Sequence, residues 1–167
     1  LSQTRVPGRL QPFPAFCFII RDLASRRKNQ KEDFSMDFNP ELLVEYARAA
    51  RVHAYCPHSG FAVGAALLAS SGEIYSGANC ESASYGATIC AERAALTAAV
   101  TAGERQFIAL AVAAGNKPVT PCGICRQMLA EFGDMTGVGA AAEGGARLET
   151  TLSALLPDAF SSDSLKE

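Results

Sequence analysis

The amino-acid sequence predicts an α/β fold, a three-layer α/β/α sandwich with a mixed sheet of about five strands. Helical and extended patterns alternate along the chain in the order α-β-β-α-β-α-β-β-α, which places helices on both faces of a sheet. An apolar run at residues 107–113 has the length and composition of a buried central strand. Two short extended runs joined through Ser70-Ser71-Gly72 predict a hairpin.

The helices are identified by signals at their ends. Asn39 is a favourable N-cap, Pro40 suits the first helical position, and Glu41 complements the helix dipole. Two later helices are expected to stop at Gly103 and Gly133. The expected helices span residues 40–52, 89–102, 121–132 and 152–156. The expected strands span residues 63–68, 74–78, 107–113, 138–142 and 147–150.

Length and composition indicate one globular domain. The chain has 167 residues, of which 49% are hydrophobic and 19% are charged, a balance that excludes the disordered class. The longest apolar runs, at residues 13–20 and 61–69, are shorter than the roughly 20 residues that span a bilayer. No membrane partner is therefore expected.

Charge is unevenly distributed along the chain. Residues 1–35 carry seven Lys or Arg and three Asp or Glu, whereas the remainder carries eight basic and fourteen acidic residues. An acidic folded part does not gather phosphates, so no nucleic-acid partner is expected and a small or neutral substrate is favoured.

Residues 1–35 contain three prolines and a basic run but no sustained periodicity, and we expect a non-native or disordered extension there. Met36 stands directly before the first helix signal. One hypothesis is that translation starts at Met36, because the preceding residues can be encoded by a purine-rich tract like a bacterial ribosome-binding site. A single domain would then span residues 36–167, and a targeting segment at residues 1–35 is the alternative.

Six cysteines occur in a chain without a convincing secretory signal, which favours reduced thiols in the cytoplasm. Two segments hold three of these cysteines: Cys90-Ala91-Glu92-Arg93 and Cys122-Gly123-Ile124-Cys125-Arg126. Each segment lies at the start of an expected helix, where backbone N–H groups and the dipole favour the thiolate that a metal needs.

Three thiolates could close around one Zn²⁺ and leave its fourth position open for water, as in catalytic zinc sites. Zinc lowers the pKa of such a water to about 7. Glu92 is too near Cys90 in the chain to bind the same ion easily, so we predict that it moves protons. Arg93 and Arg126 are expected to donate hydrogen bonds to the sulfurs.

Two other interpretations of the cysteines remain open. Cys122 and Cys125 alone could form a thioredoxin-like redox pair, although no aromatic residue precedes Cys122. A purely structural zinc would need a fourth ligand, for which the candidates are Cys56, Cys80, His53 and His58. Taken singly, three cysteines are expected to be small buried hydrophobes: Cys17, Cys56 and Cys80.

The chain from about Met36 to Phe160 resembles the short, homotetrameric cytidine deaminases of the three-cysteine zinc type, within the cytidine and deoxycytidylate deaminase superfamily. The two cysteine segments match the pattern of zinc deaminases, in which a Glu beside the first ligand is the general acid/base. Three further segments match in order: residues 61–66 (FAVGAA), 77–86 (GANCESASYG) and 155–160 (LLPDAF).

The resemblance implies a Zn²⁺ cofactor held by Cys90, Cys122 and Cys125, with Glu92 as the catalytic residue. It implies a nucleoside substrate whose contacts are Asn79 and Glu81 on the sugar hydroxyls, Phe61 packed on the nucleoside, Ala91, and Tyr85 and Phe160 from a neighbouring subunit. Without the motifs, the three aromatic residues would be interpreted as ordinary core packing.

The sequence departs from the family pattern at a few positions near the expected pocket. Ala62 replaces a common proline, Cys80 a common valine and Ser82 a common asparagine, while His58 and Gly60 alter the loop before residue 61. These changes leave the chemistry intact and bear on nucleobase and sugar preference.

The predicted function is zinc-dependent hydrolysis of free cytidine and deoxycytidine to uridine and deoxyuridine with release of ammonia, a reaction of pyrimidine salvage. One alternative is a deaminase of another aminopyrimidine, such as blasticidin S. The other is a non-enzymatic zinc or thiol module. An RNA or DNA editor would need a positive groove, which the acidic folded part disfavours.

Overall fold

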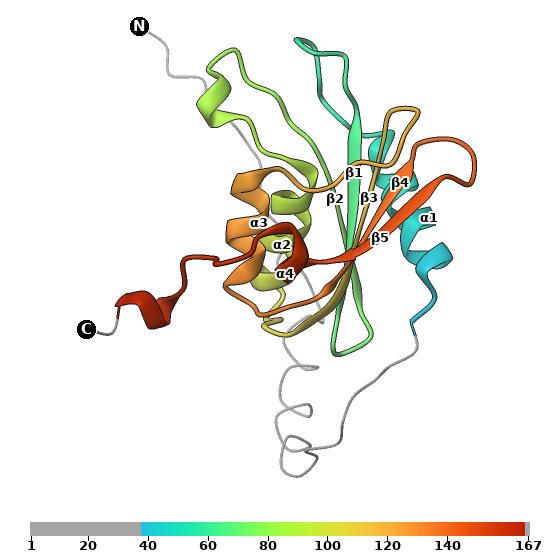
Figure 1. Cartoon of the computed structure of the whole chain (residues 1–167). Coiled ribbons are helices and arrows are strands. Elements are labelled where there is room, and N and C mark those ends of the chain that lie inside the picture. The colour runs from blue at the N-terminus through green and yellow to red at the C-terminus, as the bar shows by residue number, and fades with distance from the viewer. Residues whose placement is uncertain (1–37, 166–167) are drawn as a thin grey trace, which may run out of the picture. The chain divides into compact units, whose positions relative to one another are not determined.

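The computed structural model describes residues 38–165 of the chain (Figure 1). The expected extension at residues 1–35 and the hypothetical start at Met36 lie outside the described residues, as does Cys17. The helices are α1 (Pro40–Arg51), α2 (Ala91–Thr101), α3 (Gly123–Ala130) and α4 (Leu152–Leu155). The strands are β1 (Val63–Ala69), β2 (Ile74–Ala78), β3 (Phe107–Ala114), β4 (Thr136–Ala141) and β5 (Arg147–Thr151). Short 3₁₀ turns occupy Tyr85–Ala87 and Ser162–Leu165.

The five strands form one mixed sheet in the order β2-β1-β3-β4-β5. Strands β3 and β4 run parallel, whereas the β1–β2, β1–β3 and β4–β5 pairs are antiparallel. The predicted fold class is confirmed, and the strand expected to be central is the middle one of the sheet. The predicted hairpin is also confirmed, and its Gly72 takes a φ of 90° that residues with a side chain rarely adopt.

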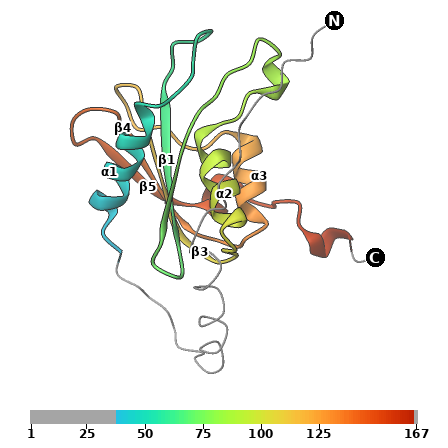
Figure 2. The same ribbon diagram turned by 180° about the vertical axis from the view of Figure 1, so that it is seen from behind.

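Helices cover both faces of the sheet, with α1 on one side and α2, α3 and α4 on the other (Figures 1 and 2). Successive side chains of β1 divide between the two cores, because neighbouring residues of a strand point to opposite faces. Leu67 packs in the core beneath α2 and α3, and Leu68 packs beneath α1. Burial of these apolar side chains is the main source of stability for such a sandwich.

Helix α1 begins where the sequence predicts. The Asn39 side-chain oxygen accepts hydrogen bonds from the backbone N–H groups of Glu41 and Leu42, at 3.0 and 3.4 Å. At the other end, the Arg51 Nε donates to the Ala62 carbonyl oxygen at 3.1 Å. Helix α1 therefore also anchors the chain segment that leads into β1.

Helices α2 and α3 begin two residues later than predicted, at Ala91 and Gly123. Before α2, Ile89 exchanges two backbone hydrogen bonds with Cys80, at 2.9 and 3.0 Å, and this bridge keeps Ile89 extended. Cys90 and Cys122 have extended backbones and are the N-cap residues of α2 and α3. The correction places both cysteines at the exposed N–H ends of their helices.

Three chain segments leave the sheet side by side at one of its ends. Val63 at the start of β1 pairs with Ala114 at the end of β3, and Gly64 pairs with Ala78 at the end of β2. The segments that precede β1 and follow β2 and β3 therefore emerge together. These segments carry the loop before Phe61, the approach to α2 and the approach to α3, so the topology brings the predicted site together.

Helix α1 approaches β1 closely at Gly64, where there is no room for a side chain. A Cβ at this position would overlap the Ala47 carbonyl oxygen and lie 2.5 Å from the Arg51 amide nitrogen, which are both backbone atoms of α1. We expect Gly64→Ala to lower the free energy of unfolding by about 1–3 kcal/mol, because a helix backbone cannot rotate aside. The measurement is the urea denaturation midpoint.

Gly86→Ala is the matched control, because a Cβ there meets no heavy atom within 4 Å. Its expected effect on the free energy of unfolding is within about 0.5 kcal/mol. Equal denaturation midpoints for the two variants would contradict the close packing of α1 on β1.

Candidate metal centre

Three cysteine sulfurs meet where α2 and α3 begin. The Sγ atoms of Cys90 and Cys122 are 3.7 Å apart, and those of Cys122 and Cys125 are 3.4 Å apart. All three lie within 4.8 Å of one another, and they are the single such group of candidate metal ligands within residues 38–165. Cys90 and Cys122 are N-caps, and Cys125 lies in the first turn of α3.

The spacing of the sulfurs fits zinc. Tetrahedral Zn²⁺ with Zn–S bonds of about 2.3 Å requires sulfurs about 3.8 Å apart, close to the observed separations. None of the four residues considered as a fourth ligand belongs to the group, so three protein ligands are offered. A three-ligand set of this kind is typical of a catalytic zinc site, and nothing in the described residues supports the alternative of a closed structural site. Cys80 is exposed and Cys56 partly so, which corrects the expectation that both are buried hydrophobes.

Burial and hydrogen bonding together shift the pKa values of the three thiols. It raises the pKa of Cys90 and of Cys125, and the neighbouring Glu92 carboxylate raises both further. Burial also raises the pKa of Cys122, but hydrogen bonds from the Cys125 backbone N–H and from the other two thiols outweigh it, so the net pKa lies below its usual value. The expected preference for thiolate at helix starts is thus found at Cys122 alone. A cation among the sulfurs favours thiolate at all three by direct attraction.

Glu92, in the first turn of α2, points its carboxyl group toward the same sulfurs. Its side chain is only 5% exposed. Burial raises the pKa of the Glu92 carboxyl, partly offset by hydrogen bonds from its own backbone N–H, from the Cys125 thiol and from the Cys122 backbone N–H. The structure therefore brings Glu92 beside the predicted ligands, in the dry position that a proton-carrying carboxyl needs.

The two arginines predicted to serve the sulfurs have different partners. Arg93 donates to the Thr88 carbonyl oxygen at 2.6 Å. Burial lowers the pKa of its guanidinium, but the interactions with the Cys90 sulfur and its neighbours outweigh burial, so the net pKa is raised. Its Nε is buried without a hydrogen-bond partner. Arg126 instead donates to three oxygens, those of Pro121, Leu155 and Thr120, at 2.7 to 3.0 Å. We therefore correct the role expected for Arg126: it ties the start of α3 to the end of α4.

Asn79 lies just beyond β2 and is used to hold the neighbouring segment in place. Its side-chain oxygen accepts from the Val63 N–H at 2.8 Å, and its amide nitrogen donates to the Phe61 carbonyl oxygen at 3.0 Å. Asn79 is 8% exposed, whereas Phe61 is 47% exposed. The amide thus fixes the backbone on both sides of Ala62 and presents the Phe61 ring toward solvent.

The Glu81 carboxylate is held by the loop at residues 56–60. It accepts hydrogen bonds from the backbone N–H groups of His58 and Ser59, at 2.9 and 3.1 Å, and from the Ser59 hydroxyl. The Ser59 hydroxyl lowers the pKa of Glu81 most, and the two backbone N–H groups contribute to the same direction. Sequence reasoning missed Ser59, although a serine beside Pro57 and Gly60 is a signal for a turn closed by its hydroxyl.

The remaining predicted substrate contacts differ in how far they are exposed. Ala91 is fully buried at the first position of α2. Tyr85 is 76% exposed on its 3₁₀ turn, and Phe160 is 59% exposed beyond α4, on a separate segment of the chain. The exposure of Phe61, Tyr85 and Phe160 excludes the core-packing interpretation within this chain.

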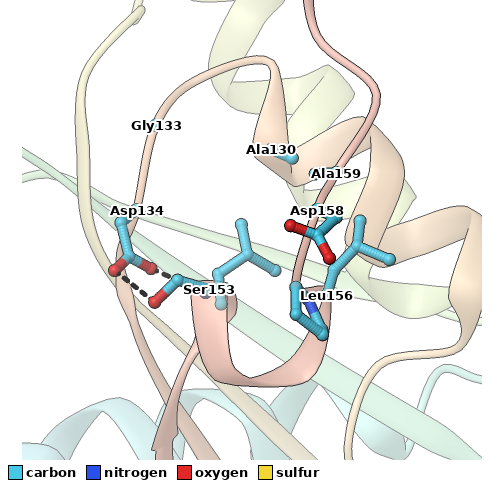
Figure 3. Close-up of a pocket in the computed structure, with 9 residues that line it drawn as sticks. Ala130, Gly133, Asp134, Ser153, Leu156, Asp158 and Ala159 are labelled. Atoms are coloured by element: carbon cyan, nitrogen blue, oxygen red, sulfur yellow. Dashed lines mark hydrogen bonds between the residues drawn. The ribbon is translucent and has the colours of Figure 1, made fainter.

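A cavity of about 340 Å³ lies at the opposite end of α3, between Ala130, Asp134 and the α4 segment (Figure 3). The Asp134 carboxylate accepts from the Ser153 hydroxyl at 2.7 Å and from its backbone N–H at 2.9 Å. None of the cysteines and none of the predicted catalytic or substrate-binding residues lines this cavity. The chemistry is therefore assigned to the sulfur cluster and not to this space.

Residues 39–140 match the family model described as the cytidine and deoxycytidylate deaminase zinc-binding region, and this span contains all three sulfurs and Glu92. The chain belongs to this deaminase family. Zn²⁺ is the cofactor of the deaminase, because the matched region binds zinc and the three sulfurs fit that ion.

Similar proteins support the family assignment. The deaminase is 49% identical to the cytidine deaminase of Sporosarcina psychrophila over 128 residues, which cover 75% of this chain and 93% of the relative. It is 46% identical to that of Halalkalibacterium halodurans over 129 residues, or 76% and 98% of the two chains. The crystal structure of cytidine deaminase from Burkholderia pseudomallei matches with a TM-score of 0.70 and 44% identity over 74% of this chain and 100% of that one. These likenesses give no support to a redox pair or to a blasticidin S deaminase.

Removal of one sulfur should release the metal. We expect Cys122→Ala to retain far less than the roughly one zinc per chain of the wild type, because two thiolates no longer complete the ligand set. Elemental analysis of the purified protein measures the zinc content. Cys80→Ala is the control, because Cys80 is a free, exposed thiol outside the cluster. Full zinc content in Cys122→Ala would overturn the ligand assignment.

Proposed function

We propose that this deaminase hydrolyses free cytidine and deoxycytidine to uridine and deoxyuridine and releases ammonia, as a step of pyrimidine salvage. The observation that carries the proposal is the buried Glu92 carboxyl beside three sulfurs that leave one corner of a tetrahedron open. The relatives reported above are named cytidine deaminases, which supports the same reaction. We further propose that residues 36–167 form the deaminase domain.

The roles of the chain's own residues follow from their positions. Cys90, Cys122 and Cys125 would hold Zn²⁺, which when bound supplies a Lewis acid that makes water nucleophilic near neutral pH. Glu92 takes one proton from the attacking water and delivers it to N3 of the cytosine ring. It then takes the second proton from the hydroxyl now on C4 and passes it to the amino group, so that the C4–N bond breaks, the C4 carbonyl forms and ammonia leaves. Arg93 offsets the negative charge of three thiolates from beside Cys90.

The unused hydrogen-bonding capacity of Glu81 and Asn79 favours a nucleoside substrate over a free base. Glu81 already accepts three hydrogen bonds, and a carboxylate has about four acceptor sites, so one remains open. Asn79 likewise keeps one N–H free after its bond to Phe61. A single sugar hydroxyl can donate to Glu81 and accept from Asn79. One hydroxyl suffices for this pair, which favours the use of both ribose and deoxyribose nucleosides.

The base is proposed to lie between Phe61 and the start of α2. The half-exposed Phe61 ring offers an apolar face for stacking. Ala91 stands between Cys90 and Glu92 in the chain, so its small side chain leaves room for a ring beside the reacting groups. An aromatic face opposite a polar, proton-carrying group is the arrangement that a flat heteroaromatic substrate requires.

We propose a homotetramer in which neighbouring subunits complete each active site. Tyr85, Ile124 and Phe160 are 76%, 63% and 59% exposed, which is unusual for large apolar side chains around a catalytic centre. Aromatic residues are enriched at subunit interfaces, where their exposed rings become buried. Tyr85 and Phe160 are the residues proposed to enter the pocket of a neighbour.

The cellular context is proposed on chemical grounds. The five cysteines among the described residues are all free, and three must stay reduced to bind zinc, which favours the cytoplasm. No nucleic-acid or membrane partner is proposed, because the acidic part after residue 35 attracts neither phosphates nor an anionic surface.

Replacement of the proton carrier tests the reaction. We expect Glu92→Gln to lower kcat for cytidine by about 10²- to 10⁴-fold, because the amide cannot accept and return a proton. Zinc content should stay near the wild-type value, because Glu92 is not a member of the ligand group. The assay follows the absorbance loss of cytidine together with ammonia release. Unchanged turnover in Glu92→Gln would refute the mechanism.

Mixed assemblies test the shared pocket. We expect Phe160→Ala to raise KM for cytidine, and co-assembly with Glu92→Gln subunits to restore activity. In a mixed oligomer, a pocket with an intact Glu92 can receive Phe160 from its neighbour. Steady-state kinetics of the co-expressed variants, with light scattering for oligomeric state, make the measurement. Leu165→Ala, which also removes an exposed side chain beyond α4, is the control. Absence of recovery in mixed assemblies would show that each pocket uses its own Phe160.

A further inference from the structure

The loop between α1 and β1 is fixed by a small number of backbone bonds. The Gly60 N–H donates to the Cys56 carbonyl oxygen at 3.0 Å, and Gly60 takes a φ of 66°, a left-handed conformation suited to glycine. Tyr55, just before the loop, bonds to Asn79 and Glu81 through its backbone at 2.9 and 2.8 Å. The loop therefore lies against the segment that follows β2, and the His58 ring meets the Tyr85 ring edge-on, with 6.1 Å between the ring centroids.

One hydroxyl closes the tip of this loop. The Ser59 hydroxyl donates to Oε1 of Glu81, and the hydroxyl oxygen of Ser59 accepts from the Phe61 N–H at 2.9 Å. A hydroxyl is well suited to this task, because it combines one donor with acceptor lone pairs on a single atom. Ser59 therefore connects the carboxylate proposed to bind the sugar with the backbone that carries the ring proposed to stack on the base.

We propose that Ser59 is a positioning residue for substrate binding, which holds the Glu81 carboxylate and the Phe61 backbone in the arrangement that receives the nucleoside. This inference rests on the proposed function. Without the Ser59 hydroxyl, Glu81 loses one of its three hydrogen bonds and the Phe61 N–H loses its partner. Both groups then sample other conformations, and binding must order them again at a cost in affinity.

The effect should fall on substrate affinity and not on the chemical step. Glu92 and the three sulfurs belong to α2 and α3, and the Ser59 hydroxyl makes no hydrogen bond to either helix among the described bonds. Loss of uniform binding raises KM and leaves kcat unchanged. A residue needed only for folding would instead lower the amount of active enzyme without this selective change.

Ser59→Ala is the central variant, measured with cytidine and with 2′,3′-dideoxycytidine as substrate or competitive inhibitor. We expect KM for cytidine to rise by about 10-fold, the typical loss for a hydrogen bond to a charged group, and kcat to stay within about 2-fold. The rise in KM for dideoxycytidine should be smaller, because that nucleoside lacks the 2′ and 3′ hydroxyls of the sugar ring that could donate to Glu81. Ser59→Thr retains the hydroxyl and should keep KM near the wild-type value.

Ser71→Ala is a matched control on the same chain. The Ser71 hydroxyl also donates to a glutamate, Glu104, at 2.7 Å and accepts from the N–H two residues later, at Glu73, at 3.4 Å. This second serine that joins a glutamate to a nearby backbone N–H lies in the β1–β2 turn, at the opposite end of β1 from Phe61, about 20 Å along the strand. We expect Ser71→Ala to leave KM and kcat for both nucleosides unchanged.

The outcomes separate the inference from the proposed function. If wild-type protein deaminates cytidine and Ser59→Ala keeps its KM, or loses kcat equally with both nucleosides, the positioning role is wrong. If wild-type protein deaminates neither nucleoside, the proposed function is wrong and the inference falls with it. Should Ser59→Ala unfold at the assay temperature, Ser59→Cys replaces it. The thiol is a weak donor of similar size, so the same rise in KM is expected.

Discussion

The crowding of three cysteine sulfurs within 4.8 Å of one another governs the chemistry of this site. Burial and the nearby Glu92 carboxylate raise the pKa values of two of these thiols, so the chain alone resists holding three negative charges there. Zn²⁺ removes that conflict, since its charge favours thiolate at every sulfur. The same burial keeps the Glu92 carboxyl away from bulk water, next to the position that three protein ligands leave open.

The residues proposed to bind the sugar, Asn79 and Glu81, already make hydrogen bonds within the protein. Asn79 uses its amide to fix the backbone around Phe61 and Val63. Glu81 is held by the loop that contains Ser59. Each retains part of its hydrogen-bonding capacity, so the groups are oriented in advance and still able to bind. Such pre-organisation reduces the entropy that substrate binding would otherwise cost.

Helix α3 connects the metal centre with the C-terminal part of the described chain. Cys122 and Cys125 supply two of the sulfurs at its start. The side chains of the next two residues bind the C-terminal segment: Arg126 donates to the Leu155 carbonyl oxygen and Gln127 to that of Phe160, each at 2.7 Å. One short helix therefore fixes both the ligands and the segment that carries Phe160, and a shift of α3 would displace both.

The sequence by itself determined the fold class, the five strands and the identity of the cysteine segments, because these rest on local patterns of apolar residues, turns and helix signals. It did not determine that Ile89 pairs with Cys80, which delays α2 and makes Cys90 an N-cap, since no helix or turn signal specifies that these two residues pair across the intervening loop. The partners of Arg126 and the bond between Ser59 and Glu81 were likewise decided only by tertiary structure. Hydrogen bonds between side chains and distant backbone depend on where the sheet places each segment, and no local pattern encodes that placement.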